Sequence, residues 1–354
     1  MKNRKTALAA MGAVALAVAL TGCVESGRTA SSGSGGGSDC PWEKDDSVTT
    51  KARIAFQKIP NGDLVVKDLG LLEACMPNAQ ITWSNFASGG DVVQAYGANS
   101  VDIGLMGSSP ATIALSAPLE LPISIVWIHD IIGSAESLVV RDDSVKDLAG
   151  LKGGTIAVPF SSTAHFSLLQ ALQDAGMDSS KDVKLINLEP EKMPSAWQGN
   201  QIDAAWVWDP VLSQLKDSGH IVLSSADTAE AGKPTYDLGT ANKKFMSANP
   251  AFMDQWAKAQ DYAVQLIDEE PDKAAESIAV EVGVSPDEAV KLFEGYSYLR
   301  ATEQAAPDAL GGKMAKDLLT TAKFLVAQGG IAAASSPEVY EAGVDAGPAE
   351  AVSR

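Results

Sequence analysis

Short apolar runs alternate along this chain with longer stretches in which apolar residues recur every third or fourth position. The short runs predict β-strands, and the periodic stretches predict α-helices. A first block has predicted strands at 53–56, 80–86, 101–106, 123–128 and 137–140, and helices at 63–73, 89–96 and 107–115. A second block has predicted strands at 155–158, 183–188, 204–208 and 221–223, a helix at 162–175 and another that ends near 199. From residue 249 onward the pattern is helical, with predicted helices at 251–268 and 271–282.

Strands that alternate with helices predict βαβ units and largely parallel sheets, so the fold class is α/β. Two such blocks followed by a helical part indicate two lobes with a cleft between them. Ligands of open α/β sheets bind beyond the carboxyl ends of the strands. That rule directs attention to three loops that follow predicted strands, at 107–110, 159–163 and 208–210.

The first apolar run, residues 7–20, follows a basic start formed by Lys2, Arg4 and Lys5. It is too short to span about 30 Å of hydrocarbon, which takes about 20 residues. A basic, apolar, small-residue order is typical of a secretion signal that is removed. The sequence LTGC that ends at Cys23 resembles a bacterial lipobox, which predicts cleavage before Cys23 and a lipid on that cysteine. The alternative is an ordinary secreted protein with a coincidental cysteine.

The residues after Cys23 form a Ser- and Gly-rich stretch, with SSGSGGGS at 31–38. Such a sequence has few apolar groups to bury and predicts a flexible tether whose ends lie about 25–30 Å apart on average. No later segment is long and apolar enough to span a membrane, so the sequence predicts a tethered soluble body.

The composition limits the possible fold and binding partners of the folded part of the chain that follows the tether. With 45% hydrophobic residues, the chain can form a sizeable core. The formal charge of −18 argues against nucleic acid, whose phosphates need a basic surface, and against binding to anionic lipid. The lipid at Cys23 would therefore provide the anchoring.

Once Cys23 is assigned to lipid, Cys40 and Cys75 remain as an even pair in an oxidising compartment, which predicts a disulfide. Two unrelated buried thiols are the alternative. The histidines, at 129, 165 and 220, are scattered, so neither a metal site nor a cofactor is expected.

Two predicted helix starts carry clustered hydroxyl groups. Ser108 and Ser109 precede Pro110, a residue favoured at the first helical positions, and the second block repeats the arrangement at 161–163. A helix start offers free backbone N–H groups and the positive end of the helix dipole, which together attract an anion. Plain helix capping is the alternative interpretation for either cluster.

Trp206 and Trp208 lie two residues apart on one predicted strand and so face the same side of it. An aromatic wall beside a carboxylate is a favourable site for an ammonium group. Glu136 and Asp237 are candidate carboxylates near the block boundaries, although each alone is better explained as an exposed acid. Trp197 is expected in the core.

Five segments together resemble the substrate-binding proteins of taurine and alkanesulfonate ABC importers, which have the type II periplasmic-binding-protein fold. The resemblance spans about residues 51–328. The five segments are 86–90 (FASGG), 102–110 (DIGLMGSSP), 134–140 (SAESLVV), 154–169 (GTIAVPFSSTAHFSLL) and 196–210 (AWQGNQIDAAWVWDP). The PFxSTxH and VWxP forms look closest to taurine-binding members.

The resemblance implies a two-lobed clamp that closes on a small sulfonate in a cleft between the lobes. The expected division is a signal peptide at 1–22, a tether at 23–50, a first lobe at 51–134 and 239–331, a second lobe at 135–238 and a tail at 332–354. The Ala, Ser and Gly content of the tail indicates partial disorder.

The candidate ligand contacts follow from the matched positions and the constellations above. They are Gln57, Ser108, Ser109, Glu136, Ser161, Ser162, Thr163, His165, Asp203, Trp206, Trp208 and Asp237. Two acids depart from the family pattern. Asp209 stands where taurine binders often have a neutral residue, and Asp130 has no assigned counterpart.

The sequence therefore predicts a lipid-anchored, extracytoplasmic and monomeric binding protein that delivers taurine to an ABC permease and needs no cofactor. Other alkanesulfonates, nitrate, bicarbonate and a betaine-like ligand are alternatives. An enzyme of the same fold, similar to a thiamine-pyrimidine synthase, would carry a cysteine-rich cluster that this chain lacks. A structural adhesin or a sensor without transport is the remaining class.

Overall fold

The structure, a computed structural model, describes residues 39–353. The predicted signal peptide, the lipid at Cys23 and most of the tether lie outside the described residues. Within the described range, no helix has the length and apolar character needed to cross a membrane.

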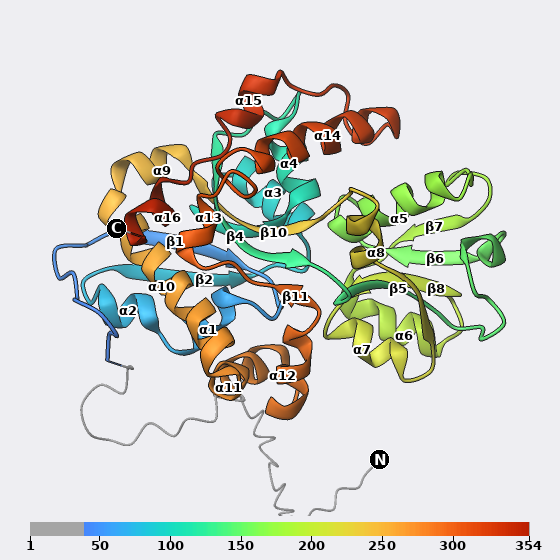
Figure 1. The fold of residues 1–354 in the computed structure, drawn as a ribbon, viewed down its shortest axis with the longest axis horizontal. Helices are drawn as coiled ribbons and strands as arrows, with labels where there is room; N and C mark the ends of the chain where they lie inside the picture. The colour runs from blue at the N-terminus through green and yellow to red at the C-terminus, as the bar shows by residue number, and fades with distance from the viewer. Residues whose placement is uncertain (1–38, 354) are drawn as a thin grey trace, which may run out of the picture. The chain divides into compact units, whose positions relative to one another are not determined.

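The first sheet has six strands in the order β11-β4-β10-β3-β1-β2 (Figure 1). They are β1 (Lys51–Phe56), β2 (Gln80–Asn85), β3 (Ile103–Gly107), β4 (Ile123–Ile132), β10 (Tyr236–Asn242) and β11 (Tyr296–Ser297). One apolar cluster contains residues of α1 (Gly62–Asp68), α2 (Leu71–Cys75), α10 (Pro250–Glu269), α11 (Pro271–Val282) and α12 (Pro286–Phe293). A second contains residues of α3 (Gly89–Gly97), α4 (Ser108–Leu115) and α14 (Lys313–Ala327). Both clusters include strand residues, so the sheet lies between two helical layers.

The second sheet has five strands in the order β7-β6-β8-β5-β9. They are β5 (Glu136–Val140), β6 (Thr155–Val158), β7 (Lys184–Asn187), β8 (Ala204–Trp208) and β9 (His220–Ser224). The helical segments of this part are η1 (Leu148–Leu151), α5 (Thr163–Asp174), η2 (Pro190–Lys192), α6 (Met193–Gln198), α7 (Val211–Lys216) and α8 (Ser225–Glu230). Trp197 on α6 is buried in one of the two clusters of this sheet, as expected for a core residue.

The expectation of largely parallel sheets is wrong. The pairs β1–β2, β1–β3, β6–β7 and β6–β8 are parallel, but β10 runs antiparallel to β3 and β4, and β5 runs antiparallel to β8 and β9. Both antiparallel strands receive the chain from the other sheet. The pattern missed β10 because Asp237, Gly239 and Asn242 are poor strand formers. Gly239 is needed there, since a Cβ atom would lie 2.9 Å from the Trp256 ring.

The chain passes from the first sheet to the second at 133–135 and returns at 231–235. The return therefore falls before Tyr236, whereas the predicted division placed it after residue 238. A third segment braces the first crossing, because the Gly295 carbonyl accepts hydrogen bonds from Gly133 N at 3.0 Å and Ala135 N at 3.3 Å. A side chain at position 295 would overlap Ala135, so glycine is required.

The C-terminal tail is ordered, which corrects the expectation of partial disorder. Helices α15 (Pro337–Glu341) and α16 (Gly347–Val352) lie in this tail. The helices α9 (Lys243–Ala248) and α13 (Ala301–Gln304) lie earlier in the chain. Tyr340 is fully buried, and its hydroxyl forms a hydrogen bond with Ser116 Oγ at 2.7 Å. The tail packs because this aromatic anchor outweighs the small residues around it.

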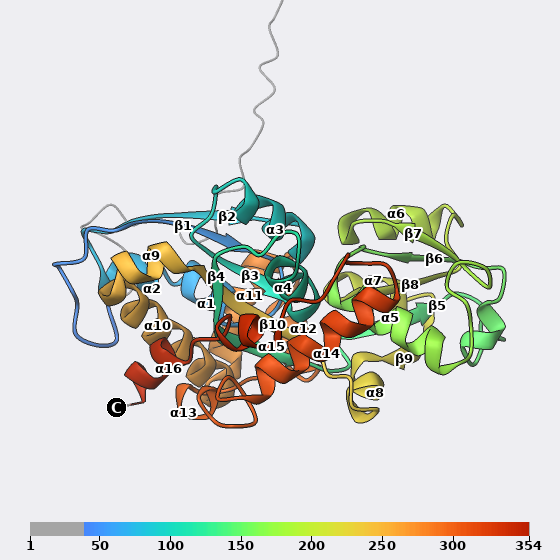
Figure 2. The same ribbon diagram turned by 90° about the horizontal axis from the view of Figure 1, so that it is seen from above.

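Helix α14 also reaches the second sheet's helices (Figure 2). Phe324 on α14 meets Phe166 on α5 edge to face, with ring centroids 5.3 Å apart. Gln328 Nε2, just beyond α14, donates to Gln173 Oε1 at 3.1 Å. These contacts join the helices of the two sheets.

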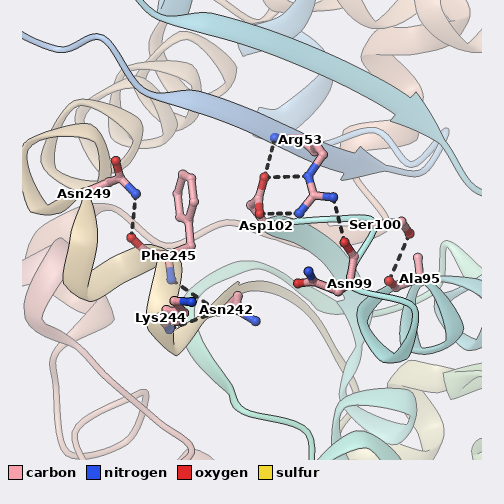
Figure 3. Close-up of polar contacts among 9 residues, drawn as sticks. All are labelled: Arg53, Ala95, Asn99, Ser100, Asp102, Asn242, Lys244, Phe245 and Asn249. Carbon is pink, nitrogen blue, oxygen red and sulfur yellow. Dashed lines mark hydrogen bonds and ion pairs between the residues drawn. The ribbon is translucent and has the colours of Figure 1, made fainter.

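At the amino ends of β1 and β3, polar side chains satisfy one another (Figure 3). Arg53 donates from Nε and Nη2 to the two carboxylate oxygens of Asp102, at 2.9 and 2.7 Å, and from Nη1 to the Asn99 carbonyl. Asn242 caps α9 by accepting from Lys244 N at 2.9 Å. This edge is closed by structural contacts, so the opposite edge, at the carboxyl ends of the strands, is where a ligand site is expected.

Cys40 and Cys75 form the predicted disulfide, with Cα atoms 4.9 Å apart. Cys75 is fully buried at the end of α2, so the bond fixes the start of the described chain to the first lobe's helices.

We predict that the double variant Cys40→Ser with Cys75→Ala lowers the free energy of unfolding by about 2–4 kcal/mol, because the bond closes a long loop in the unfolded chain. Urea denaturation of the purified protein measures this. Reductant should destabilise the wild type to the same extent and leave the variant unchanged; equal stability of all samples would contradict the prediction.

Candidate ligand-binding site

A small cavity lies at the carboxyl ends of the strands, between residues of both sheets. Its lining residues are Gln57, Ile59, Gly89, Gly107, Pro110, Ile132, Glu136, Ser162, Thr163, Trp208, Asp237 and Tyr296. They combine the starts of three helices with two acidic side chains and an aromatic pair.

The three helix starts are those of α3, α4 and α5. Gly89 is the first residue of α3, Gly107 is the N-cap of α4, and Ser162 caps α5 by accepting from His165 N at 3.1 Å. Each start directs backbone N–H groups and the positive end of a helix dipole toward the cavity. The arrangement can therefore hold an anionic group without a cationic side chain.

Glycine permits the helix starts to approach. A Cβ atom at Gly107 would lie 2.6 Å from Thr163 Cγ2, and one at Gly89 would lie 2.6 Å from Pro110 Cγ. Both distances are far below van der Waals contact, so α4 approaches α5 and α3 approaches α4 only because these positions lack side chains.

Glu136, the first residue of β5, is 1% exposed and reaches the start of α5. Its Oε2 atom accepts from Thr163 Oγ1 at 2.5 Å, and its Oε1 atom accepts from Ser225 Oγ at 2.7 Å. Burial raises the pKa of Glu136 to about 7, while the hydrogen bonds from Thr163, Ser225 and the Ala164 backbone favour the ionised form. Glu136 thus accepts some of the hydrogen bonds that the start of α5 can donate.

Asp237 on β10 is the second acidic lining residue. It lies opposite Asp130 of β4 in the antiparallel ladder, and both side chains are buried. Burial, followed by the nearby charge of Glu136, raises the pKa of Asp237 to about 8. Asp130 is fully buried behind it, and burial together with the charge of Asp237 raises the pKa of Asp130 well above its usual range.

The remaining polar lining comes from Gln57, which follows β1, and from Tyr296 of β11. Gln57 Nε2 donates to the Leu105 carbonyl at 3.2 Å. The buried Tyr296 hydroxyl has no hydrogen-bond partner within residues 39–353 and is available to a ligand. Tyr296 was missed from the sequence because a two-residue strand has no periodic signal.

Six of the candidate contacts meet at the cavity wall. They are Gln57, Glu136, Ser162, Thr163, Trp208 and Asp237. Ser108 and Ser109 are buried in the first turn of α4, where Ser108 Oγ accepts from Tyr236 N at 3.3 Å. Neither serine lines the cavity, so this turn contributes through Gly107 and Pro110.

Ser161 and His165 form a local structure beside the cavity. His165 stacks on Phe160 with ring centroids 4.5 Å apart, and its Nδ1 accepts from Ser161 N at 3.3 Å. Burial lowers the pKa of His165 to about 4, so the ring is neutral near pH 7. Ser162 Oγ donates to the Pro159 carbonyl at 2.6 Å, so the hydroxyl is not bonded to the imidazole ring.

Two candidate contacts lie elsewhere, and those interpretations are corrected. Asp203 precedes β8 at the end opposite Trp208, is exposed, and accepts from Thr155 N at 2.7 Å. Trp206 is fully buried in the apolar cluster beneath α5. It shares a face of β8 with Trp208, as predicted, but only Trp208 is near enough to the strand's carboxyl end to reach the cavity.

Asp209 follows Trp208 and also lies outside the cavity wall. Its Oδ1 atom accepts from Ser213 N at 2.9 Å and from Ser213 Oγ at 2.7 Å, at the start of α7. Its role is therefore to cap that helix. Within residues 39–353, no three His, Cys, Asp or Glu side chains are grouped so that they could hold a metal ion.

Comparison with known proteins places this geometry in a family. Residues 64–282 match the sequence profile of the NMT1-like family. The taurine-binding periplasmic protein of Escherichia coli (strain K12) is 34% identical over 264 residues, which cover 73% of this chain and 81% of that protein.

Two solved structures share the fold. The alkanesulfonate-binding protein SsuA from Xanthomonas axonopodis pv. citri, bound to MOPS, has a TM-score of 0.67 at 22% identity, covering 86% of this chain and 99% of that chain. The periplasmic nitrate-binding protein NrtA from Synechocystis PCC 6803 has a TM-score of 0.68 at 15% identity, covering 86% and 89%. These likenesses confirm the predicted two-lobed periplasmic-binding-protein fold.

The packing of Gly107 against Thr163 generates a prediction. Gly107→Ala should lower the free energy of unfolding by about 1–3 kcal/mol, because the added methyl group forces α4 and α5 apart. Urea denaturation of the ligand-free body measures the change.

Gly97→Ala is the matched control. A Cβ atom at position 97, the last residue of α3, would have no neighbour within 4 Å, so this variant should be as stable as the wild type or more stable by up to about 1 kcal/mol. Equal effects of the two substitutions would show that the contact between α4 and α5 is not close in solution.

Proposed function

This chain belongs to the NMT1-like family, and we propose that it is the binding protein of an ABC importer whose ligand is taurine. Its taurine-binding relative and the fold shared with SsuA support a sulfonate-binding role. The choice of taurine within that class is supported by the chemistry of the cavity.

One observation carries the proposal: a single small cavity is lined both by helix starts and by buried carboxyl groups. Taurine carries a sulfonate and an ammonium group separated by two carbon atoms. A short zwitterion of this kind can place its negative end at the helix starts and its positive end at Glu136 and Asp237.

The sulfonate would be held by neutral donors. None of the cavity-lining residues in the described chain is Lys or Arg, so the backbone N–H groups at the three helix starts would face the anion, because the Thr163 and Ser162 hydroxyls already donate to Glu136 and to the Pro159 carbonyl. A sulfonate remains ionised at any physiological pH, so these dipoles need no proton exchange to bind it. Exclusion of water when the lobes close strengthens each charge-assisted hydrogen bond.

The ammonium group would be held by charge and by an aromatic surface. Glu136 and Asp237 supply carboxylate oxygens, Tyr296 supplies a free hydroxyl, and the Trp208 ring offers cation–π attraction. Without a cation the two acids are costly to bury in ionised form. The amine would therefore supply the positive charge that these two acids lack in the empty cavity.

The alternative ligands fit this cavity less well. Nitrate and bicarbonate have no cationic group to balance Glu136 and Asp237, and the same is true of simple alkanesulfonates. A betaine has a quaternary ammonium group that cannot donate hydrogen bonds to the two carboxylates.

A binding role also explains the site better than catalysis. Its only nearby imidazole, that of His165, is engaged in stacking and in a bond from Ser161 N. The named relatives reported above are binding proteins. We propose that the chain is not an enzyme and acts as a monomer that presents its loaded, closed form to the permease.

The proposal includes a location. Cys23 in the LTGC motif would carry a lipid that retains the body at the outer surface of the cell membrane. Its charge of −18 disfavours electrostatic binding to anionic lipid, so the lipid would provide the attachment.

We predict that taurine raises the melting temperature by about 4 °C at a concentration of about 100 Kd, because ligand binding adds RT ln(1 + [L]/Kd) to stability. Thermal-shift measurements should compare taurine with ethanesulfonate, ethylamine, nitrate and glycine betaine. Ethanesulfonate lacks the amine and ethylamine lacks the sulfonate, so each should produce a much smaller shift. A shift with glycine betaine or nitrate and none with taurine would refute the assignment.

The lipid attachment has its own test. Cys23→Ala in the full-length chain should move the protein from the membrane fraction to the soluble extracytoplasmic fraction, because the acylated residue is lost. Cys40→Ser is the matched control and should remain with the membrane. Retention of Cys23→Ala at the membrane would exclude this lipid as the anchor.

A further inference from the structure

A second acid lies directly behind the acidic wall of the cavity. Asp130 on β4 is the cross-strand neighbour of Asp237 on β10, and their exposed fractions are 0% and 5%. Asn61 Nδ2 donates to Asp130 Oδ2 over a long 3.5 Å. Asp130 Oδ1 has no N–H or O–H donor within residues 39–353, and the residue opposite it in the ladder is the acid Asp237.

The groups that face this pair supply no positive charge. Glu136 on β5 adds a negative charge, and Tyr296 and Tyr298, near β11, are neutral. Asp209 adds negative charge near Tyr296. At the start of α1, the Asn61 side chain is neutral. The Asp63 carboxylate contacts other residues and does not pair with Asp130 or Asp237.

Asp63 belongs to a separate pair on the same side of the core. Its Oδ2 atom lies 3.6 Å from His129 Nε2, and its Oδ1 atom accepts from Gln260 Nε2 at 2.6 Å. Burial lowers the pKa of His129, so this ring is not a counter-ion for Asp130.

Three buried carboxyl groups without a cation cannot all be ionised. Two of them, Asp130 and Asp237, are cross-strand neighbours, so one proton held between them would let one acid donate to the other. The empty cavity therefore contains a bound proton at the position where a ligand's positive group is expected.

We propose that Asp130 is a specificity-determining residue: paired with Asp237, it holds a proton that only a ligand with a cationic amine displaces. This inference rests on the proposed function and extends it. In the empty site the carboxyl O–H of one acid donates to the other. When the ammonium N–H groups donate to Asp237 and Glu136, the shared proton leaves to the solvent, and the cation replaces its charge.

The two ligand classes then differ in their dependence on pH. Binding of an aminosulfonate releases a proton from the acid pair, so the affinity of the protein for this ligand rises with pH. Ethanesulfonate brings no cation, leaves the proton in place, and gains no affinity as the pH rises. Selectivity for the amine is therefore greatest on the alkaline side of the pair's titration.

Isothermal titration calorimetry in phosphate and in Tris at about pH 7.5 counts the protons released, because the two buffers have different heats of ionisation. The wild type should release about one proton per taurine and about none per ethanesulfonate. Between about pH 6.5 and 7.5 its taurine affinity should rise up to about tenfold.

Asp130→Asn retains the shape and can still donate to Asp237, but it has no proton to lose. It should release about one proton fewer per taurine than the wild type, and its affinity should rise less steeply over the same pH range, with the remaining rise due to Glu136 and Asp237. Asp203→Asn removes an exposed acid at the far end of β8 and should behave as the wild type. Proton release from Asp130→Asn equal to that of the wild type would overturn the proposal, as would a wild type that releases none.

A measurement without ligand separates this proposal from the assignment of taurine. The shared proton is bound in the folded protein at pH values where the unfolded chain has lost it, because burial and neighbouring negative charges raise the pKa of both Asp130 and Asp237 above the ordinary value of about 4. Stability therefore falls as the pH rises through this window, and the melting temperature should fall more in the wild type than in Asp130→Asn. If no sulfonate binds, the proposed function fails; equal falls in the two proteins would overturn the acid pair itself.

Discussion

The cost of burying carboxyl groups is the constraint on which this site depends. Glu136 and Asp237 are placed in the core by two strands that enter from opposite sheets, and neither has a cationic side chain as a partner. The cost of burying Glu136 is offset by three hydrogen bonds, two from the start of α5 and one from Ser225 of α8, and the cost of burying Asp237 would be offset by the proposed shared proton. The same contacts connect β5, α5 and α8, so the electrostatic balance of the cavity and the packing of the second lobe are coupled.

Much of the fold could be predicted from periodicity. The strands β1, β2, β6 and β8 and the long helix α10 appear within a few residues of their expected positions, because their apolar patterns are regular. The central strand β10 could not be predicted, since Gly239 is selected by its contact with Trp256 and the polar ends of the strand serve the site. Its direction, and hence the mixed sheets, is a tertiary property that no local pattern contains.

The site residues also divide into those that could be predicted from the sequence and those that could not. Helix starts and strand ends have local signals in the sequence. For that reason the sequence could predict the cavity residues Ser162, Thr163 and Trp208. Asp203 and Trp206 belong to the same sequence motif as Trp208, but their depth along β8 removes them from the cavity. Tyr296 and the pairing of Asp130 with Asp237 depend on strand register between distant segments, which the sequence does not reveal.

The two crossing segments have a mechanical consequence. Glu136 directly follows the crossing at 133–135, and Asp237 lies two residues after the one at 231–235, whereas the starts of α3, α4 and α5 belong to helices of different sheets. In a rotation about these crossings, the two acids lie close to the axis and would move little. The helix starts lie farther from the axis and would move more. Opening would therefore leave the acidic wall nearly unchanged while it separates the donors of α5 from those of α3 and α4. In the proposed function, the groups that bind the anion would be complete only when the lobes meet, so one end of the cavity would be permanent and the other would exist only on closure.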